Sequence, residues 1–257
     1  MKICSLSDIH GSFIDIPECD VLCIAGDIVD LNNQRSIEAS RHWWYNRFTN
    51  WVNRLPCKKV IITPGNHDFF LEDAYNKGYY SELKQDLSVR TNGKLVILID
   101  EQYTYEGIKF YGCPYIKPIS FQKGRWAFED RGVNVGEIDP DTGEENTSDE
   151  VITHYNKIPN DIDILITHDN PFNNELLGNV AKHKIAHFYG HWHEGPELRK
   201  SGYYNCSLLT DMYNNKDNYE PVIIDTEEQV IEEDDIPWET NLNTEEESKR
   251  GINDAKV

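Results

Sequence analysis

Five short polar signatures occur in order along the chain of 257 residues, and each contains side chains that can bind a metal ion. They are Asp8-Ile9-His10, Gly26-Asp27, Gly65-Asn66-His67-Asp68, Thr167-His168 and Gly190-His191-Trp192-His193. The candidate ligands are two carboxylates, one amide oxygen and four imidazoles: Asp8, Asp27, Asn66, His10, His168, His191 and His193. Nitrogen and oxygen ligands together suit Mn, Fe, Zn, Ni or Co better than Mg. Because this set is too large for one tetrahedral ion, it predicts two adjacent ions that share a carboxylate, with His67 left over.

The charge of the chain bears on what this site could bind. The net charge is −20, so an anionic substrate must be attracted by the site itself. Two divalent ions with Asp8 and Asp27 would give a local charge of about +2, and distant acids are screened over about 8 Å. We therefore expect the site to attract a small phosphate anion. A nucleic-acid polymer is disfavoured as a partner because the sequence has no basic stripe.

Each signature directly follows an apolar run of strand length, with Pro64 intervening before the third. These five runs are Ile3–Leu6, Val21–Ala25, Val60–Thr63, Ile162–Ile166 and Ile185–Tyr189. Near-continuous apolar strands predict an α/β fold with a sheet buried on both faces, and Leu95–Ile99 and Val222–Ile224 would add further strands. Sites in open α/β sheets collect beyond the carboxyl ends of the strands. The five signatures can therefore converge in one cleft.

The spacing within the signatures also suits a shared site. Asp8 and His10 are separated by one residue, as are His191 and His193. In extended backbone such residues point to the same side, so each pair can offer two ligands to one site. Three glycines are expected to allow tight turns and close backbone approach, namely Gly26, Gly65 and Gly190.

Simpler interpretations exist for each signature alone, since Gly-Asn-His-Asp can be a turn and Gly-His-Trp-His a strand end. The combination is more specific, because five of the nine histidines fall within the signatures, at strand ends. The other histidines are expected in surface or core roles: His42, His154, His183 and His187.

Two further segments predict local structure. Tyr103–Tyr105 and Lys109–Tyr111 flank Glu106-Gly107 and predict a hairpin. Arg35–Leu55 has helical periodicity and ends before Pro56. Its apolar stripe favours core packing over a cofactor-binding box and consists of Ile37, Trp44, Phe48, Trp51 and Leu55.

The chain length suits one large domain over residues 1–231, followed by an acidic tail over residues 232–257. Within the domain, Phe121–Glu150 is rich in Gly, Asp and Glu and is expected to form a surface excursion. Thr226–Val257 contains eleven acidic and three basic residues, so the tail is expected to be flexible, with partner docking or self-masking as the alternative.

Composition gives an expectation about location. No apolar leader begins the chain, no run approaches the ~20 residues of a membrane span, and the six cysteines include no Cys-x-x-Cys. We expect a soluble, cytoplasmic protein with reduced, mostly buried thiols and no membrane partner. A homodimer is an arrangement that the sequence leaves open.

The ordered set of signatures resembles the calcineurin-like metallophosphoesterase superfamily, over Lys2 to about Asp225. Two shorter segments, Phe110-Tyr-Gly-Cys-Pro-Tyr115 and His193-Glu194-Gly195, resemble its small metallophosphoesterase-domain-containing (MPPED-like) subfamily. The resemblance implies a four-layer α/β/β/α sandwich, the metallo-dependent phosphatase fold.

The resemblance also implies roles for the site residues. Asp8, His10, Asp27 and His193 would hold the first ion, and Asp27, Asn66, His168 and His191 the second. Asp27 would bridge the two ions, which are divalent transition metals with manganese as the first expectation and Fe, Zn, Ni or Co as alternatives. His67 would be the catalytic histidine, and Asp68 would orient it.

The implied reaction is in-line attack on phosphorus by a metal-bridging hydroxide. His67 would protonate the leaving alkoxide, while the Asp68 carboxylate would fix the ring and keep it protonated. We expect a phosphodiesterase that hydrolyses small diesters such as cyclic nucleotides. The alternatives are a phosphomonoesterase or serine/threonine protein phosphatase, a nuclease, and a non-catalytic scaffold.

A locally basic and aromatic loop over Pro114–Gly136 bears on the substrate. Its cations are Lys117, Lys123, Arg125 and Arg131, and its aromatic residues include Trp126. Such a loop could hold a phosphate and stack a base, so Arg125 and Trp126 are predicted to contact the substrate. The alternative is a packed loop whose charges are solvated.

Overall fold

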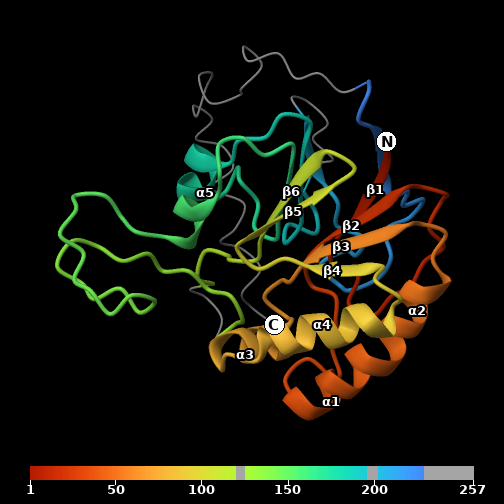
Figure 1. Ribbon diagram of the computed structural model, residues 1–257, viewed down its shortest axis with the longest axis horizontal. Coiled ribbons are helices and arrows are strands. Elements are labelled where there is room, and N and C mark those ends of the chain that lie inside the picture. Colours follow the sequence, from red (N-terminus) through yellow and green to blue (C-terminus); the bar gives the residue numbers. More distant parts are fainter. Residues whose placement is uncertain (120–124, 196–201, 229–257) are drawn as a thin grey trace, which may run out of the picture.

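The structure is a computed structural model that describes residues 1–119, 125–195 and 202–228. Its centre is a pair of five-stranded sheets (Figure 1). The first sheet has the order β10-β1-β2-β3-β4, in which β10 is antiparallel to β1 and the other neighbours are parallel. Its strands are β1 (Lys2–Leu6), β2 (Val21–Ala25), β3 (Lys59–Thr63), β4 (Leu95–Ile97) and β10 (Val222–Asp225).

The second sheet follows chain order, β5-β6-β7-β8-β9. Its strands are β5 (Glu101–Tyr105), β6 (Ile108–Cys113), β7 (Ile164–Thr167), β8 (Ala186–Tyr189) and β9 (Tyr203–Asn205). The predicted hairpin is confirmed, because β5 and β6 pair antiparallel with Tyr103 opposite Phe110. The remaining neighbours are parallel.

The apolar strands are explained by burial on both faces. In β2, Val21, Cys23 and Ala25 belong to the core between the two sheets, whereas Leu22 and Ile24 belong to the core beneath the helices. From the second sheet, side chains such as Phe110, Ile164 and Phe188 fill the space between the sheets. Successive residues of a strand point to opposite faces, so a strand between two layers must be apolar throughout.

Helices flank both sheets and complete the predicted α/β/β/α sandwich. The helices α1 (Ile37–Trp43), α2 (Thr49–Arg54), α3 (Phe69–Asn76) and α4 (Tyr80–Arg90) lie on the outer side of the first sheet (Figure 1). The helix α5 (Glu175–Val180) and a short 3₁₀ helix (His154–Lys157) lie on the side of the second sheet. The helices α3, α4 and α5 and the strand β9 had no recognised sequence signal.

The predicted single helix over Arg35–Leu55 is interrupted. A π-helical turn at Trp44–Phe48 separates α1 from α2. The wider turn coincides with burial of two consecutive side chains, Trp43 and Trp44, which a regular helix stripe does not favour. The prediction of core packing is confirmed, since Trp44 and Phe48 are fully buried and their rings lie 4.6 Å apart.

Much of the predicted surface excursion is visible in Figure 1 as the irregular segment that projects beside α5. Residues 120–124 lie outside the described residues, while Ala127 and Phe128 are buried against the core. The acidic tail from residue 229 onward also lies outside the described residues, so the domain boundary near residue 231 and the role of the tail stay predictions.

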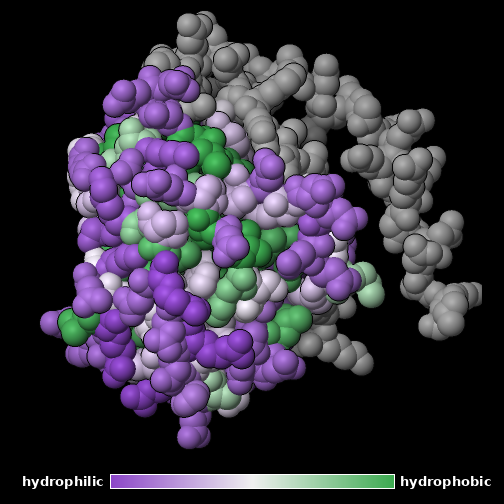
Figure 2. Space-filling view, turned by 90° about the vertical axis from the view of Figure 1, so that its right-hand side faces the viewer, coloured by the Kyte–Doolittle hydropathy of each residue, from purple (hydrophilic) through white to green (hydrophobic). Residues whose placement is uncertain are grey.

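The face shown in Figure 2 is mostly hydrophilic, with hydrophobic side chains in small patches between polar ones. All six cysteines are free and buried, as predicted. Within the described part of the chain, no helix combines the length and apolar character that a membrane crossing requires. The cytoplasmic location stays a prediction.

Candidate dinuclear metal centre

The predicted ligands lie in loops that follow the strands, and four of them adopt left-handed backbone. The φ angles are 52° at Asp8, 39° at His10, 54° at Asp27 and 65° at His191. Such values are uncommon for residues other than glycine and cost about 1–3 kcal/mol each. The expectation that extended backbone aligns these pairs is therefore wrong. The side chains converge because the chain turns sharply after β1, β2 and β8.

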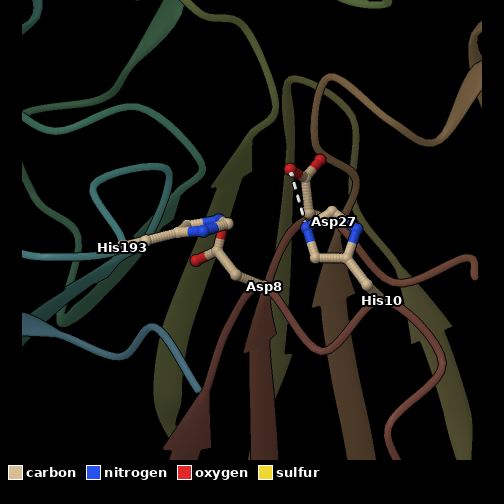
Figure 3. A group of neighbouring side chains, drawn as sticks. All are labelled: Asp8, His10, Asp27 and His193. Atoms are coloured by element: carbon tan, nitrogen blue, oxygen red, sulfur yellow. Dashed lines mark hydrogen bonds and ion pairs between the residues drawn. The ribbon is translucent and has the colours of Figure 1, made fainter. Parts of the chain in front are cut away.

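Four of the predicted ligands form a tight group. Asp8, His10, Asp27 and His193 each offer one ligand atom, and these atoms lie within 4.8 Å of one another. Figure 3 shows their side chains pointing toward one another from the loops beyond the strands. His193 Nε2 lies 3.2 Å from Asp8 Oδ1, and His10 Nε2 lies 3.6 Å from Asp27 Oδ2.

A second group surrounds the other oxygen of Asp27. His168 Nε2 lies 3.3 Å from Asp27 Oδ1 and 2.9 Å from Asn66 Oδ1. The ring of His191 lies next to that of His168, and the two ring centroids are 5.1 Å apart. Asp27 therefore touches both groups, as a bridging carboxylate must.

The donor set fits metal ions. Both ring nitrogens of His10 are buried without a hydrogen-bond partner, so the lone pair of one of them can bind a metal cation. Burial opposes ionisation of Asp8, but its hydrogen bond with His193 and the nearby His168 hold the pKa of Asp8 below its usual range. Buried carboxylates beside imidazoles without thiolates suit divalent transition metals.

Hydrogen bonds to the far side of Asp8, His168 and His193 fix the orientation of these three side chains. Asp8 Oδ2 accepts from Ser7 Oγ and Ser207 Oγ, each at 2.6 Å. His168 Nδ1 lies 2.8 Å from the carbonyl oxygen of Ala25, and His193 Nδ1 lies 3.0 Å from that of Thr210. Each contact leaves Nε2 to face the site. Ser207 and Thr210 were missed, because tertiary contacts bring their segment to the site: β9 pairs with β8, and Ser207 forms a parallel bridge with Ser7.

Gly26 and Gly190 lie so close to side chains of the site that a Cβ atom at either position would clash with them. A Cβ at Gly190 would lie 1.8 Å from Ser7 Oγ and 2.5 Å from Asp8 Oδ2. Gly26 has a φ of 90°, and its Cβ would lie 2.3 Å from His168 Nδ1. Side chains at these positions would displace metal ligands, which supports the prediction of close backbone approach.

Comparison with known proteins identifies this arrangement. The family described as Calcineurin-like phosphoesterase matches residues 1–195. The chain belongs to this family. It is therefore a metal-dependent phosphoesterase, and the family implies divalent ions at the two ligand groups.

Relatives support the closer resemblance as well. The phosphoesterase is 28% identical over 254 residues to Metallophosphoesterase domain-containing protein 1 of Homo sapiens, covering 84% of this chain and 67% of the relative. The protein of that name in Mus musculus gives the same values. A UPF0046 protein of Caenorhabditis elegans is 24% identical over 237 residues, covering 85% of this chain and 71% of that protein.

The predicted catalytic histidine of the phosphoesterase lies at the rim of the ligand groups. His67 Nε2 is 3.7 Å from Asp27 Oδ2, and its ring lies 4.7 Å from that of His10. Burial lowers the pKa of His67 to about 4, against the attraction of Asp27. Burial therefore favours the neutral form of the ring, whereas the predicted role in catalysis needs a proton on it. An anionic phosphate beside it would raise its pKa again.

The predicted contact between Asp68 and His67 is wrong. Asp68 accepts backbone hydrogen bonds from Gly65 at 2.8 Å and Val29 at 3.0 Å, while His67 Nδ1 has no partner. Burial, with the negative charge of Asp27, raises the pKa of Asp68 to about 7. Asp68 therefore joins the loops after β2 and β3 and does not orient the histidine ring.

A pocket of about 580 Å³ opens over the ligand groups of the phosphoesterase. Trp126 lines this pocket, whereas Arg125 does not, and the predicted contact of Trp126 with substrate stays a prediction. Arg125 Nη2 instead donates to Glu72 Oε1 at 2.7 Å, so this structure does not bring Arg125 to the pocket. Tyr213 also lines the pocket and was missed, because its segment carries no motif.

Proposed function

We propose that this metal-dependent phosphoesterase is a phosphodiesterase that hydrolyses small diesters such as cyclic nucleotides, with manganese as its first candidate metal. The observation that carries the proposal is the pair of ligand groups around Asp27 at the floor of a pocket. The pocket volume of about 580 Å³ lies in the range of small-molecule sites.

The charge of the pocket wall supports a diester over a monoester. A phosphodiester carries one negative charge, whereas a monoester carries up to two near neutral pH. Among the described residues, Lys117 is the one lysine or arginine that lines the pocket, and Asp169 and Asp211 line it as well. A wall with few cations and several acids favours the less charged anion.

The chemistry divides between the ions and the residues of the chain. When bound, two divalent ions would activate the attacking water and neutralise the phosphate oxygens. Asp8 and His193, with His10 and the bridging Asp27, would hold the first ion. Asn66, His168 and His191 would hold the second together with Asp27.

In the proposed mechanism, His67 would transfer a proton to the leaving group. Hydrolysis forms a bond from a water oxygen to phosphorus and breaks the bond from phosphorus to the leaving ester oxygen. The leaving oxygen takes a proton from His67, and the water gives up one proton that restores the histidine through solvent. Such general acid catalysis is typically worth about 10²–10⁴-fold in rate.

The test is a substrate screen of the purified protein with elemental analysis of its metals. Bis(p-nitrophenyl) phosphate and cyclic nucleotides are compared with p-nitrophenyl phosphate, a phosphopeptide and single-stranded DNA, each with Mn, Ni, Zn, Fe and Mg. We expect two bound ions and faster turnover of the diesters. The Asp27→Asn variant, purified in parallel, shows the background from contaminating enzymes.

A preference for the phosphopeptide over both diesters would contradict the proposal and favour a protein phosphatase. Cleavage of single-stranded DNA at physiological salt would favour a nuclease. Absence of bound metal after incubation with each ion would favour a non-catalytic scaffold.

A further inference from the structure

Trp126 forms one wall of the pocket directly beside His67. The centroids of the two rings lie 4.6 Å apart at an angle of 39°. Trp126 is half-buried and His67 is only 6% exposed, so the tryptophan is one of the side chains that cover the histidine. Any group bonded to an oxygen within reach of His67 must therefore approach Trp126.

The guanidinium of Arg35 packs on the indole ring of Trp126 and stabilises its position. The Arg35 guanidinium carbon lies 4.2 Å from the ring centroid of Trp126 and 4.3 Å from that of Phe69. The same guanidinium donates through Nη1 to the carbonyl oxygen of Arg125 at 2.8 Å. Cation–π contacts of this kind hold the ring without filling the pocket, so Arg35 is a positioning residue for Trp126.

The backbone next to Trp126 is tied to the loop that carries His67. The N–H of Ala127 donates to the carbonyl oxygen of Asn66 at 3.1 Å, and the N–H of Phe128 donates to Glu72 Oε1 at 3.0 Å. Glu72 lies on α3, which begins directly after the His67 loop. The distance between the indole and the imidazole is therefore set by two hydrogen bonds from the backbone after Trp126, one to the backbone of Asn66 and one to the side chain of Glu72.

Tyr213 forms a second aromatic wall near the same histidine. Its ring centroid lies 6.4 Å from that of His67 and 5.1 Å from that of His10. The residue has a φ of 58° and is 42% exposed, so its ring reaches the pocket from a turn after β9. Trp126 and Tyr213 both line the pocket and both lie near the proposed proton donor.

We propose that Trp126 and Tyr213 form a leaving-group site that selects phosphodiesters whose leaving alcohol carries a flat aromatic ring. The inference rests on the proposed function, because it takes His67 as the donor to the leaving oxygen. A proton donor must lie within hydrogen-bond reach of that oxygen, so the rest of the leaving group occupies the space beside His67. Two aromatic walls bound that space and favour a ring by stacking and edge contacts.

The experiment compares two diesters that differ in the leaving alcohol. Benzyl methyl phosphate and 2-methoxyethyl methyl phosphate release alcohols of similar acidity, so intrinsic reactivity cancels in their ratio. The release of benzyl alcohol and of 2-methoxyethanol is measured, and the ratio of kcat/KM values is calculated for each variant.

We expect the wild-type protein to prefer the benzyl ester. Trp126→Ala should reduce the ratio by about tenfold, because stacking on an aromatic side chain is worth roughly that much. Trp126→Phe should retain most of it, and Tyr213→Ala should reduce it by a smaller factor. Met212→Ala is the matched control, since Met212 is next to Tyr213, 79% exposed and outside the pocket lining.

Arg35→Met tests the positioning role, because it keeps an apolar stem and removes the guanidinium. We expect a reduced benzyl preference with an unchanged melting temperature and metal content. An unchanged ratio in this variant would overturn the role of Arg35.

A binding readout that needs no turnover accompanies the kinetics. p-Nitrobenzylphosphonate quenches tryptophan fluorescence on contact, so the wild-type protein should show saturable quenching that Trp126→Phe largely loses. Equal ratios in wild type, Trp126→Ala and Tyr213→Ala, with quenching independent of Trp126, would overturn the leaving-group site. If Trp126→Ala fails to fold, the leaving-group site is tested by the kcat/KM ratio of Tyr213→Ala and by the loss of quenching in Trp126→Phe. Absence of all diester turnover would count against the proposed function, whereas the quenching would still report on the aromatic site.

Discussion

The carboxylate of Asp8 accepts the backbone N–H of His191 at 3.1 Å, although the two residues are 183 positions apart. Asp8 follows β1 in the first sheet, and His191 follows β8 in the second. This hydrogen bond therefore joins the ends of the two sheets at the place where the predicted ligands meet. The metal centre is complete only when both sheets have packed together.

Replacement of His67 tests its proposed role in proton transfer. His67→Ala should reduce turnover of an alkyl phosphodiester by at least about 100-fold, since it removes the proton donor. Metal content should persist, because His67 belongs to neither proposed ligand group. Kinetics and elemental analysis on the same preparation give both values. Unchanged turnover would remove His67 from the mechanism.

Replacement of Ser207 tests the support of Asp8. Ser207→Ala removes one of the two hydroxyl donors at 2.6 Å from Asp8 Oδ2, so metal affinity should fall by about 10–100-fold. Titration of the metal-free protein with Mn, followed by calorimetry, measures the affinity. Ser81→Ala on the exposed face of α4 is the control. Equal affinities in both variants would mean that Ser7 alone orients the carboxylate.

The aromatic core beneath the π-helical turn should dominate the stability of the helical layer. Phe48 is fully buried and contacts the rings of Trp43 and Trp44. Phe48→Ala should reduce the free energy of unfolding by about 3–5 kcal/mol through lost burial and the cavity left behind. Urea unfolding measures this difference, with the exposed Arg47→Ala as control. A loss below about 1 kcal/mol would show that the helical layer collapses around the gap.

The buried His187 should make the folded state sensitive to acid. Burial, with a smaller contribution from His183, holds the pKa of His187 well below its usual value. The unfolded chain therefore binds a proton below about pH 6.5 that the folded protein does not, so stability is full above that pH and is lost as the pH falls.

His187→Gln removes this titration. Between about pH 6.5 and pH 5.5, wild type should lose up to about 1.4 kcal/mol more unfolding free energy than the variant. Urea unfolding at both pH values measures the difference, and the histidines that do not interact with His187 cancel because both proteins contain them. Identical pH dependence would contradict the prediction.

The sequence by itself determined the ligand types, their order and the strands that precede them. Metal-binding side chains are recognisable by type, and β2 was predicted with its observed bounds because its apolar run is continuous. The prediction of four layers with two sheets came from the family resemblance of the signatures. An apolar run predicts a strand, but it does not indicate which sheet the strand joins.

Only the tertiary structure decided how the residues around the ligands divide their roles. Asp68 was expected beside the ring of His67, but backbone N–H groups from the loop after β2 occupy its carboxylate. Of the neighbours Arg125 and Trp126, the arginine pairs with α3 and the tryptophan faces the pocket. Side-chain direction in loops depends on φ angles and on contacts with distant segments. Such contacts leave no local pattern in a sequence. Strands, in contrast, leave apolar runs, and metal ligands are recognisable by residue type.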